Sequence, residues 1–540
     1  MTDSAADLQR RRFLRDSARW ALAAGTLATV PAAWSAPPRA ELETIVRVRG
    51  GRVRGLREDG INVFRGLRYG ADTAPTRFQA PRREQPWRGI ADATAYGNAA
   101  PQGGSEGPGS EDCLFLNVWT PALDDGRKRP VLVYIHGGAY NNGSGSDPLY
   151  DGSALCRRGD VVVVSVNHRL NVFGYLYLDA LGDPRFAGSG NVGQLDLVQA
   201  LQWVREHAAI FGGDPANVTV FGQSGGGAKI ATLMAMPAAR GLFQRAWTMS
   251  GQQVTAAGPR AAAQRAAIAM DKVGARDIDA LLRLPADELL GATRARDPSR
   301  VEDTSLYFGP VLDDVVLPAH PFWPQAPAQS AAIPMVIGNT RDETRAFLGN
   351  DPANFELTWE TLPARLEKQQ YVDLRPQRVI DEYRRLYPHY TPSEVFFAAT
   401  TAGRSWRGAV EELEARARQP AGAAPTWAYQ LDWGSPLDGG RMGAFHTLDI
   451  PLVFDNTAQP GSRTGGGDDA RTVATAMSEA LLAFARSGDP NHAGIPHWEP
   501  YTLPRRQTLV FDRQSQLADD PRGGERELYQ QAPFIQRGTL

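Results

Sequence analysis

The chain contains the segment Asn217-Val-Thr-Val-Phe-Gly-Gln-Ser-Gly-Gly-Gly-Ala-Lys-Ile-Ala-Thr-Leu-Met-Ala-Met236. Its first part is a short apolar run with β-branched residues, which predicts a buried strand, and its last part has the composition of a helix. Between them stands Ser224, flanked by four glycines. A strand, a Gly-x-Ser-x-Gly turn and a helix in this order are typical of a sharp turn that exposes a reactive serine at the end of a sheet strand. Ser224 is therefore a candidate nucleophile.

Short apolar runs of the same kind recur along the chain. They stand at residues 131–135, 161–166, 246–249, 334–337, 427–431 and 508–511. Helix-like segments lie between them. The clearest covers residues 194–212, where apolar residues recur at helical spacing and the segment ends in two glycines. Strands that alternate with helices predict an α/β fold with a large, mostly parallel central sheet flanked by helices.

The composition is that of an ordinary globular protein. The 540 residues are 42% hydrophobic and 22% charged, and the formal net charge is −2. A nucleic-acid-binding protein usually carries an excess of basic residues, so we expect no nucleic-acid partner. Apart from His446, none of the eight histidines stands at metal-ligand spacing from Cys, Asp or Glu, as in an H-E-x-x-H pair, so we expect no metal, and no cofactor is implied.

Residues 1–35 predict a signal peptide. Arg10-Arg11-Arg12-Phe13-Leu14 resembles the twin-arginine export motif R-R-x-F-L. The apolar stretch that follows is about 14 residues long, whereas a membrane span needs roughly 20. We therefore expect export to the periplasm or the medium, cleavage near Ser35, a single mature catalytic domain over residues 36–540, and no membrane span.

The sequence also offers a candidate oxyanion hole. A serine hydroxyl that attacks an acyl group needs a base, an acid that orients the base, and N–H groups that stabilise the developing oxyanion. His136-Gly-Gly-Ala139 follows the predicted strand at 131–135 and matches the glycine loop that supplies such groups in esterases. We expect the oxyanion to be bound by the N–H groups of Gly138, Ala139 and Gly225, and His136 to shape the loop without transferring protons.

Several longer motifs carry a resemblance to a known family. Residues 110–121, Ser-Glu-Asp-Cys-Leu-Phe-Leu-Asn-Val-Trp-Thr-Pro, and residues 211–226, which end in Gly-Gln-Ser-Gly-Gly, are similar to its two signatures. Residues 167–170 and 189–196 also fit. On these motifs the chain resembles the type-B carboxylesterases, the family of the cholinesterases and of bacterial para-nitrobenzyl esterases. The matches run from about residue 43 to residue 511.

The resemblance implies an α/β-hydrolase fold with helical cap elements at about 255–300 and 355–420. It also implies the two other members of a catalytic triad. Glu343, at the end of Gly338-Asn-Thr-Arg-Asp-Glu343, matches the family's acid, and the adjacent Asp342 is the alternative. His446, in Gly443-Ala-Phe-His446, matches the base. Thr344 stands where the family usually has glycine, which is a departure in the turn that follows the acid.

Gln223, directly before the candidate nucleophile, is a second departure, because the family usually has glutamate at this position. A carboxylate beside the catalytic histidine would stabilise the imidazolium that forms during the reaction, and an amide lacks that charge. The further acidic residue that the family places after the histidine is present as Asp449. We therefore expect altered tuning of His446 without loss of activity.

The predicted function is hydrolysis of a small-molecule carboxylic ester through an acyl-enzyme on Ser224. Since some bacterial relatives act on toxin esters such as fumonisins, a toxin or xenobiotic ester is one candidate substrate. An amidase or carbamate hydrolase with the same triad stays open, because a triad does not distinguish acyl oxygen from acyl nitrogen. A non-catalytic binding module is disfavoured by the presence of all three triad residues. The oligomeric state and a bridge between Cys113 and Cys156 also stay open.

Overall fold

The computed structural model describes residues 43–104, 109–297 and 305–536. The predicted signal peptide, residues 1–35, lies outside the described residues, as does the end of the first predicted cap region, residues 298–300. All the described residues belong to one contact unit, which extends over Ala40–Leu540.

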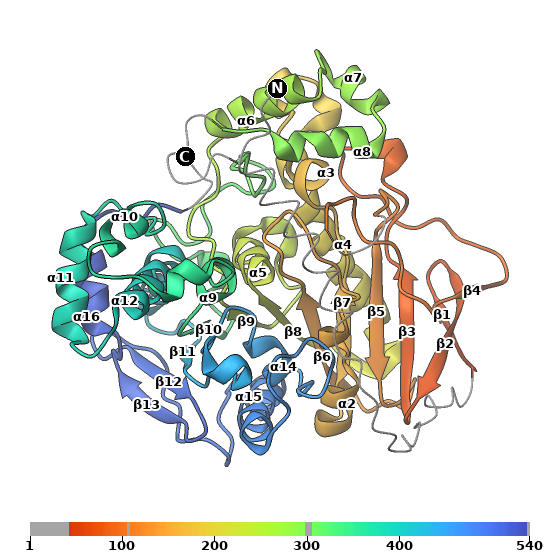
Figure 1. The fold of residues 1–540 in the computed structure, drawn as a ribbon. Helices are drawn as coiled ribbons and strands as arrows, with labels where there is room; N and C mark the ends of the chain where they lie inside the picture. Colours follow the sequence, from red (N-terminus) through yellow and green to blue (C-terminus); the bar gives the residue numbers. More distant parts are fainter. Residues whose placement is uncertain (1–42, 105–108, 298–304, 537–540) are drawn as a thin grey trace, which may run out of the picture. The chain divides into compact units, whose positions relative to one another are not determined.

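A mixed β-sheet runs through this unit (Figure 1). The spatial order of its strands is β1-β2-β3-β5-β7-β6-β8-β9-β10-β11-β12-β13, with β4 beside β2. All neighbours from β7 to β12 pair in parallel, whereas the two ends of the sheet are mainly antiparallel. The predicted α/β class with a mostly parallel central sheet is therefore confirmed. The strands are β1 (Glu43–Val48), β2 (Gly51–Glu58), β3 (Ile61–Arg68), β4 (Ile90–Asp92), β5 (Phe115–Thr120), β6 (Arg129–Ile135), β7 (Val162–Val166), β8 (Gly213–Gln223), β9 (Arg245–Met249), β10 (Met335–Thr340), β11 (Thr426–Leu431), β12 (Gln507–Phe511) and β13 (Gln516–Asp519).

The predicted apolar runs correspond to the parallel strands, and the antiparallel strands were not predicted. Each parallel strand from β6 to β12 is buried over most of its length, as expected for strands with helices on both faces. Strand β2, in contrast, alternates between buried and more accessible residues. A strand with only one covered face has no continuous apolar run, so a search of the sequence for such runs does not detect the strand.

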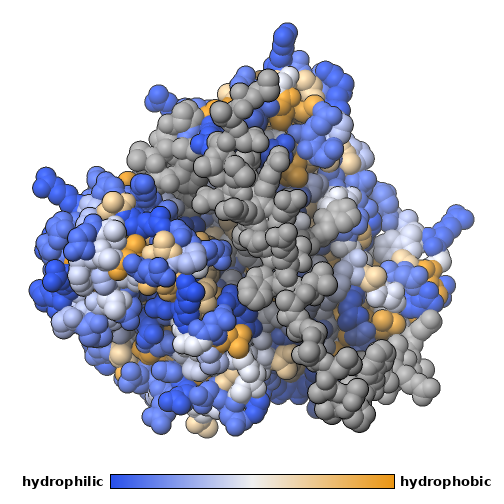
Figure 2. Space-filling view, in the orientation of Figure 1, coloured by the Kyte–Doolittle hydropathy of each residue, from blue (hydrophilic) through white to orange (hydrophobic). Residues whose placement is uncertain are grey.

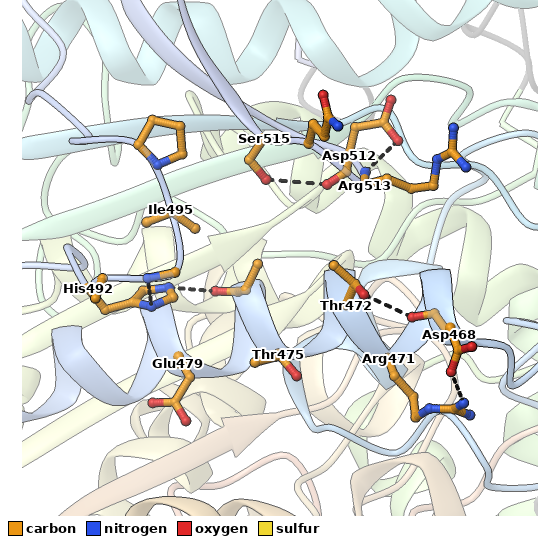
Figure 3. A pocket seen from close by; sticks show the side chains of 15 residues that line it. Asp468, Arg471, Thr472, Thr475, Glu479, His492, Ile495, Asp512, Arg513 and Ser515 are labelled. Atoms are coloured by element: carbon orange, nitrogen blue, oxygen red, sulfur yellow. Dashed lines mark hydrogen bonds and ion pairs between the residues drawn. The ribbon is translucent and has the colours of Figure 1, made fainter.

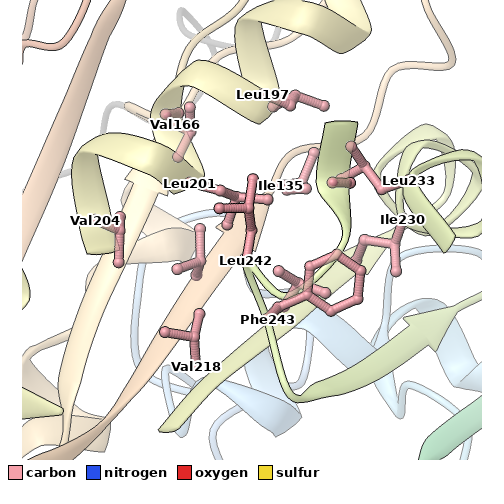
Figure 4. Close-up of a cluster of buried hydrophobic side chains, with 14 of the residues drawn as sticks. Ile135, Val166, Leu197, Leu201, Val204, Val218, Ile230, Leu233, Leu242 and Phe243 are labelled. Carbon is pink, nitrogen blue, oxygen red and sulfur yellow. The ribbon is translucent and has the colours of Figure 1, made fainter. Parts of the chain in front are cut away.

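Helices cover both faces of the sheet. On one face, α4 and α5 pack against the strands, and Figure 4 shows Leu197, Leu201, Ile230 and Leu233 in the buried cluster that they form with the sheet. On the other face lie α2, α14 and α15. The helices are α2 (Ser153–Gly159), α3 (Asn171–Tyr175), α4 (Val192–His207), α5 (Gly225–Ala235), α6 (Pro259–Lys272), α7 (Ile278–Arg283), α8 (Ala286–Leu289), α9 (Arg345–Leu348), α10 (Leu362–Glu367), α11 (Pro376–Leu386), α12 (Pro392–Thr401), α13 (Arg407–Ala417), α14 (Asp449–Val453), α15 (Asp468–Ser487) and α16 (Gly523–Tyr529).

The two cysteines are not bridged. Cys113 and Cys156 are both buried free thiols. Cys113 belongs to the cluster on the α4 and α5 side of the sheet, and Cys156 belongs to the cluster on the α15 side. Because the sheet separates the two clusters, these side chains do not meet.

The two regions without predicted strands contain helices in their described parts. Helices α6, α7 and α8 come from the first region and lie together at the top of Figure 1, and α10 to α13 come from the second. The face of the molecule in Figure 2 is mainly hydrophilic, with small separate hydrophobic patches. In the part of the chain that the structure describes, no helix is long and apolar enough to cross a membrane.

Candidate active site

Ser224 occupies a strained turn between β8 and α5. Strand β8 ends at Gln223 and α5 begins at Gly225, so the predicted strand, turn and helix are all present. The backbone of Ser224 has φ 55° and ψ −126°, a conformation that non-glycine residues rarely adopt. It is held there because its N–H donates to the Met249 carbonyl at 2.7 Å and its own carbonyl accepts from the N–H of Ala228 at 3.1 Å. The turn is thus fixed by the sheet and the helix together.

The glycines after Ser224 allow the oxyanion loop to approach the turn. A Cβ atom on Gly225 would lie 2.0 Å from the carbonyl oxygen of Ala139, and one on Gly226 would lie 1.9 Å from that of Ile135. No side chain fits at these distances. The glycine-rich sequence is therefore required by close backbone packing and does not indicate a flexible turn.

The predicted oxyanion donors lie on these two touching segments. Gly138 and Ala139 have φ of 80° and 52°, and the carbonyl of Gly138 accepts from the N–H groups of Asn141 and Asn142 at 3.1 and 3.2 Å. Among the described residues, no acceptor takes the N–H of Gly138 or Ala139. Gly225 is the first residue of α5, where N–H groups have no partner within the helix. All three N–H groups are therefore free to bind an anion.

Two buried histidines and a buried lysine hold the predicted oxyanion loop in place. The rings of His136 and His168 are stacked with centroids 4.8 Å apart, and the ammonium of Lys229 donates to the carbonyl of His136 at 3.1 Å. Burial, together with the charge of Lys229, lowers the pKa of His136 to about 3. His136 is therefore neutral and shapes the loop. Lys229 was not predicted, although a lysine within the apolar stretch Ala228–Met236 was a visible signal.

His446 contacts Glu343 and not the alternative acid. The Nδ1 atom of His446 is hydrogen-bonded to Oε2 of Glu343, while Oε1 of Glu343 accepts from the N–H of Thr340 at 3.0 Å and from the side-chain amide of Asn339 at 3.2 Å. Asp342 instead accepts from the N–H of Ala444 at 3.0 Å and pairs with a nearby arginine. Glu343 is thus fixed on both carboxylate oxygens and orients the imidazole.

Glu343 is held in its ionised form. Burial alone would raise the pKa of this carboxyl group, because the side chain is fully buried. The charge of His446 and the hydrogen bonds from His446 and from the Thr340 N–H outweigh burial, so the pKa of Glu343 lies below its usual value. An ionised carboxylate on Nδ1 leaves Nε2 as the nitrogen that can accept a proton from a serine.

Thr344, which stands where the family usually has glycine, fits the local turn. Its φ is −75° and its ψ is −10°, a right-handed conformation that every residue type adopts, so a glycine is not needed here. The side chain is fully buried, and its hydroxyl donates to the carbonyl of Phe397 at 3.0 Å and lies 2.8 Å from the hydroxyl of Thr400. The threonine therefore ties the turn after Glu343 to α12.

Several residues around this site have a strained backbone. Besides Ser224 and Ala139, two further non-glycine residues beside it have positive φ: Ser250 at 51° and Thr447 at 82°. For a β-branched residue such as Thr447 this conformation is strongly disfavoured. Strained residues persist where the surrounding structure fixes them, and they cluster at functional sites. The segment that follows His446 is therefore set by its contacts and not by local preference.

Gln223 lies across the imidazole ring of His446. Its buried side-chain nitrogen is 3.2 Å from Nε2 and 3.4 Å from Nδ1 of His446. Because one atom cannot lie on the lone-pair axes of both ring nitrogens, we infer that the amide packs on the ring. Among the described residues, the Ser224 hydroxyl makes no hydrogen bond to His446, and such bonds often form only when substrate is bound.

Asp449 is part of the buried surroundings of the triad without contacting His446 by a hydrogen bond. It opens α14, and its Oδ2 accepts from the hydroxyl of Tyr429 at 3.0 Å, whereas its Oδ1 has no partner. Burial, and next to it the charge of Glu343, raises the pKa of Asp449 to about 7. Asp449 is therefore largely protonated below neutral pH. Near neutral pH, only a fraction of the molecules carries the negative charge expected of a second acid.

We expect Gln223→Glu to move the acidic limb of the pH–rate profile to higher pH by about one unit. A carboxylate packed on the ring favours the protonated imidazole, which cannot act as the base, so activity on the acidic side falls. The measurement is kcat/KM for a neutral ester between pH 5 and pH 9. Gln223→Met, which removes the amide without adding a charge, is the control and should leave the limb in place. An unchanged profile in Gln223→Glu would refute this role of residue 223.

One cavity lies away from Ser224, Glu343 and His446. About 960 Å³ in volume, it lies between α15 and the segments around His492 and Asp512 (Figure 3). Its charged residues are mostly paired, for instance Arg471 with Asp468. A smaller cavity of about 210 Å³ is lined by His446 and by residues of the loops on either side of it. Of these two cavities, only the smaller one is lined by His446, and neither Ser224 nor Glu343 lines it.

Comparison with known proteins places the chain in a family. Residues 42–529 match the model of the carboxylesterase family. The para-nitrobenzyl esterase of Bacillus subtilis (strain 168) is 37% identical over 502 residues, which cover 89% of this chain and 98% of the relative. The fumonisin B1 esterase of Sphingopyxis macrogoltabida is 33% identical over 512 residues, which cover 92% and 90%. The solved structure of the Geobacillus stearothermophilus carboxylesterase EST55 superimposes with a TM-score of 0.79 at 38% identity, over 90% of this chain and 100% of that chain.

The fold is therefore an α/β-hydrolase fold. The chain belongs to the carboxylesterase family and is a carboxylic ester hydrolase. The resemblance found in the sequence motifs is confirmed.

Proposed function

We propose that the protein hydrolyses its ester through an acyl-enzyme on Ser224, with His446 as base and Glu343 as the acid that orients it. The observation that carries the proposal is the arrangement of His446 on a fully buried Glu343, together with a serine at a strained strand-to-helix turn that touches a loop with free N–H groups. Ser224, His446 and Glu343 together form the complete set of side chains that acyl transfer requires.

In the proposed mechanism, Nε2 of His446 accepts the proton of Ser224 while the serine oxygen attacks the ester carbonyl. The N–H groups of Gly138, Ala139 and Gly225 bind the oxyanion of the tetrahedral intermediate. His446 then donates the proton to the departing alcohol. A water molecule, activated by the same histidine, releases the acid and restores Ser224.

The experiment has two parts. A fluorophosphonate probe followed by peptide mass spectrometry should place the adduct on the peptide that contains Ser224, and an adduct on another residue would overturn the proposal. Para-nitrophenyl esters should then be compared with the matched para-nitroanilides. Hydrolysis of the esters alone supports an esterase, whereas comparable rates on the anilides would favour the amidase alternative.

The particular ester is a further part of the proposal. One relative bears the name fumonisin B1 esterase and another the name para-nitrobenzyl esterase, so a toxin or xenobiotic ester is a reasonable class to test first. An esterase screen with fumonisin B1 beside simple alkyl and aryl esters separates these cases by their kcat/KM values.

We also propose that residues 1–35 direct export through a twin-arginine signal. The support is the sequence Arg10-Arg11-Arg12-Phe13-Leu14 before an apolar stretch. The double variant Arg10→Lys, Arg11→Lys should leave most of the esterase in the cytoplasmic fraction, measured by activity and immunoblot. Arg12→Lys, at the variable position of the motif, is the matched control and should be exported normally. Export of the double variant at the normal level would contradict the proposal.

A further inference from the structure

The cavity beside His446 has one aromatic and apolar wall and one cationic edge. Leu149, Phe347, Met442 and Phe445 line it together with His446, whose ring centroid is 4.8 Å from that of Phe347. Phe347 is 41% exposed, and its ring also contacts the guanidinium of Arg404, whose carbon lies 4.4 Å from the ring centroid. A flat, partly aromatic group would therefore find a matching surface directly next to the catalytic imidazole.

Arg463 carries the only fixed charge among the residues that line this cavity. No carboxylate lines it, and the nearby acids have other partners: Glu343 is bound to His446, and Asp342 pairs with Arg345. In the described residues, no salt bridge to Arg463 is formed. The cavity therefore offers an exposed guanidinium that is not neutralised by the protein.

The backbone of Arg463 is anchored, so its guanidinium is presented from a defined position. Its φ is 55°, a left-handed conformation that costs energy for a residue other than glycine. The Arg463 carbonyl accepts from the hydroxyl of Ser435 at 2.5 Å, and the neighbouring Ser462 and Thr464 hydroxyls both donate to the carbonyl of Thr457, at 2.8 and 2.9 Å. The guanidinium lies over the ring of Phe445, with its carbon 4.8 Å from the ring centroid. Stacking of this kind leaves the N–H edge free for a planar anion.

The position of the cavity decides which half of the ester it receives. His446 gives its proton to the oxygen of the departing alcohol, so the alcohol lies on the histidine's side of the scissile bond. None of the oxyanion residues, Gly138, Ala139 and Gly225, lines the cavity. Ser224 does not line the cavity either, so its assignment to the leaving group rests on the position of His446 in its wall.

We propose that Arg463 is a specificity-determining residue that binds a carboxylate carried by the alcohol half of the ester, so that the enzyme favours esters with an anionic leaving group. The carboxylate accepts two N–H bonds from the guanidinium while the aromatic or apolar part of the alcohol packs beside Phe347. The inference rests on the proposed function, since it takes Ser224 and His446 as the reacting groups.

The test uses two acetate esters that differ in charge and hardly in shape. 4-Acetoxybenzoate carries a carboxylate on its leaving group, and 4-acetoxybenzamide carries a neutral amide at the same position. In Arg463→Gln we expect kcat/KM for 4-acetoxybenzoate to fall about tenfold or more, because a charge-assisted hydrogen-bonded pair is lost, while kcat/KM for 4-acetoxybenzamide changes less than about twofold. Arg463→Lys should retain part of the kcat/KM for 4-acetoxybenzoate that Arg463→Gln loses. Each variant is compared with the unaltered enzyme on the same substrate, so the intrinsic reactivity of the esters cancels.

Arg471→Gln is the matched control, because Arg471 is an exposed arginine that lines the larger cavity of Figure 3. Arg471→Gln should leave kcat/KM unchanged for both substrates. Equal losses on both substrates in Arg463→Gln, or no loss on 4-acetoxybenzoate, would overturn the proposal. Activity on the neutral ester reports that the variant is folded. Failure of the proposed function would give a different result: a variant without Ser224 would still hydrolyse both esters.

Discussion

Ser224→Ala is expected to lower kcat for para-nitrophenyl acetate by at least about 10⁴-fold, because it removes the oxygen that we propose forms the acyl-enzyme. Binding and oxyanion stabilisation survive the change, so a small residual rate above that in water should remain, and KM should change little. The alanine side chain fits the same space. Since φ at this position is 55°, the strain of the turn is the same for alanine as for serine. The measurement is steady-state kinetics together with the fluorophosphonate adduct, which should be absent in the variant.

Ser405→Ala is the control for Ser224→Ala. Ser405 lies near the acid, where its hydroxyl accepts from the amide of Asn339 at 2.9 Å, and it has no part in the proposed acyl transfer. It should keep activity within about tenfold, the ordinary range for losing one neutral hydrogen bond. A variant without Ser224 that hydrolysed the ester at the normal rate after purification from host esterases would refute the assignment of the nucleophile.

The second large effect is expected from Glu343→Gln, which should reduce kcat by about 10⁴-fold with a much smaller change in KM. The carboxylate of Glu343 is hydrogen-bonded to Nδ1 of His446 and, in the proposed mechanism, stabilises the imidazolium. An amide has no charge for this purpose, and its NH₂ group can reverse the tautomer so that Nε2 no longer accepts a proton. Asp342→Asn is the matched control, because Asp342 is the adjacent acid and binds the N–H of Ala444 instead. If Asp342→Asn caused the larger loss, the two acids would have exchanged roles.

The same substitution has a consequence for stability. The pKa of Glu343 is lower in the folded protein than in the unfolded chain, where it is about 4.3. A lowered folded pKa stabilises the protein at every pH above that unfolded value, and the stabilisation is lost as the pH falls through the folded pKa. The difference in Tm between the unaltered enzyme and Glu343→Gln should therefore be largest near neutral pH and should shrink below about pH 4. A difference that grew on acidification would contradict the lowered pKa.

Much of the fold followed from local patterns. The parallel strands β6 to β12 are continuous apolar runs because both their faces are buried, and such runs are visible in the sequence. Strand β2 of the antiparallel edge alternates between buried and more accessible residues, so it was not distinguished from a loop. The free thiols of Cys113 and Cys156 could not be predicted either, because the sequence does not show which face of a sheet a residue between elements will reach.

The candidate site was found in part by pattern and in part by resemblance. Glycines around Ser224 and at Gly138 are needed for close backbone contact, and that need is local enough to be read as a motif. The pairing of His446 with Glu343 joins residues 103 positions apart, and only the resemblance to a family indicated it. Lys229 was missed because its partner, the carbonyl of His136, lies on another segment.

Neighbouring residues or a motif were enough to predict the class of fold, the serine turn and the family, and they also led to the proposed oxyanion loop. Contacts in the folded protein were needed to see how Gln223 meets His446, why Thr344 suits a position usually held by glycine, and that Arg463 lines the cavity beside His446. These depend on contacts between segments far apart in the chain and on the burial that sets a group's charge. Such contacts are fixed by the packing of the whole sheet and its helices, and no single stretch of sequence contains them.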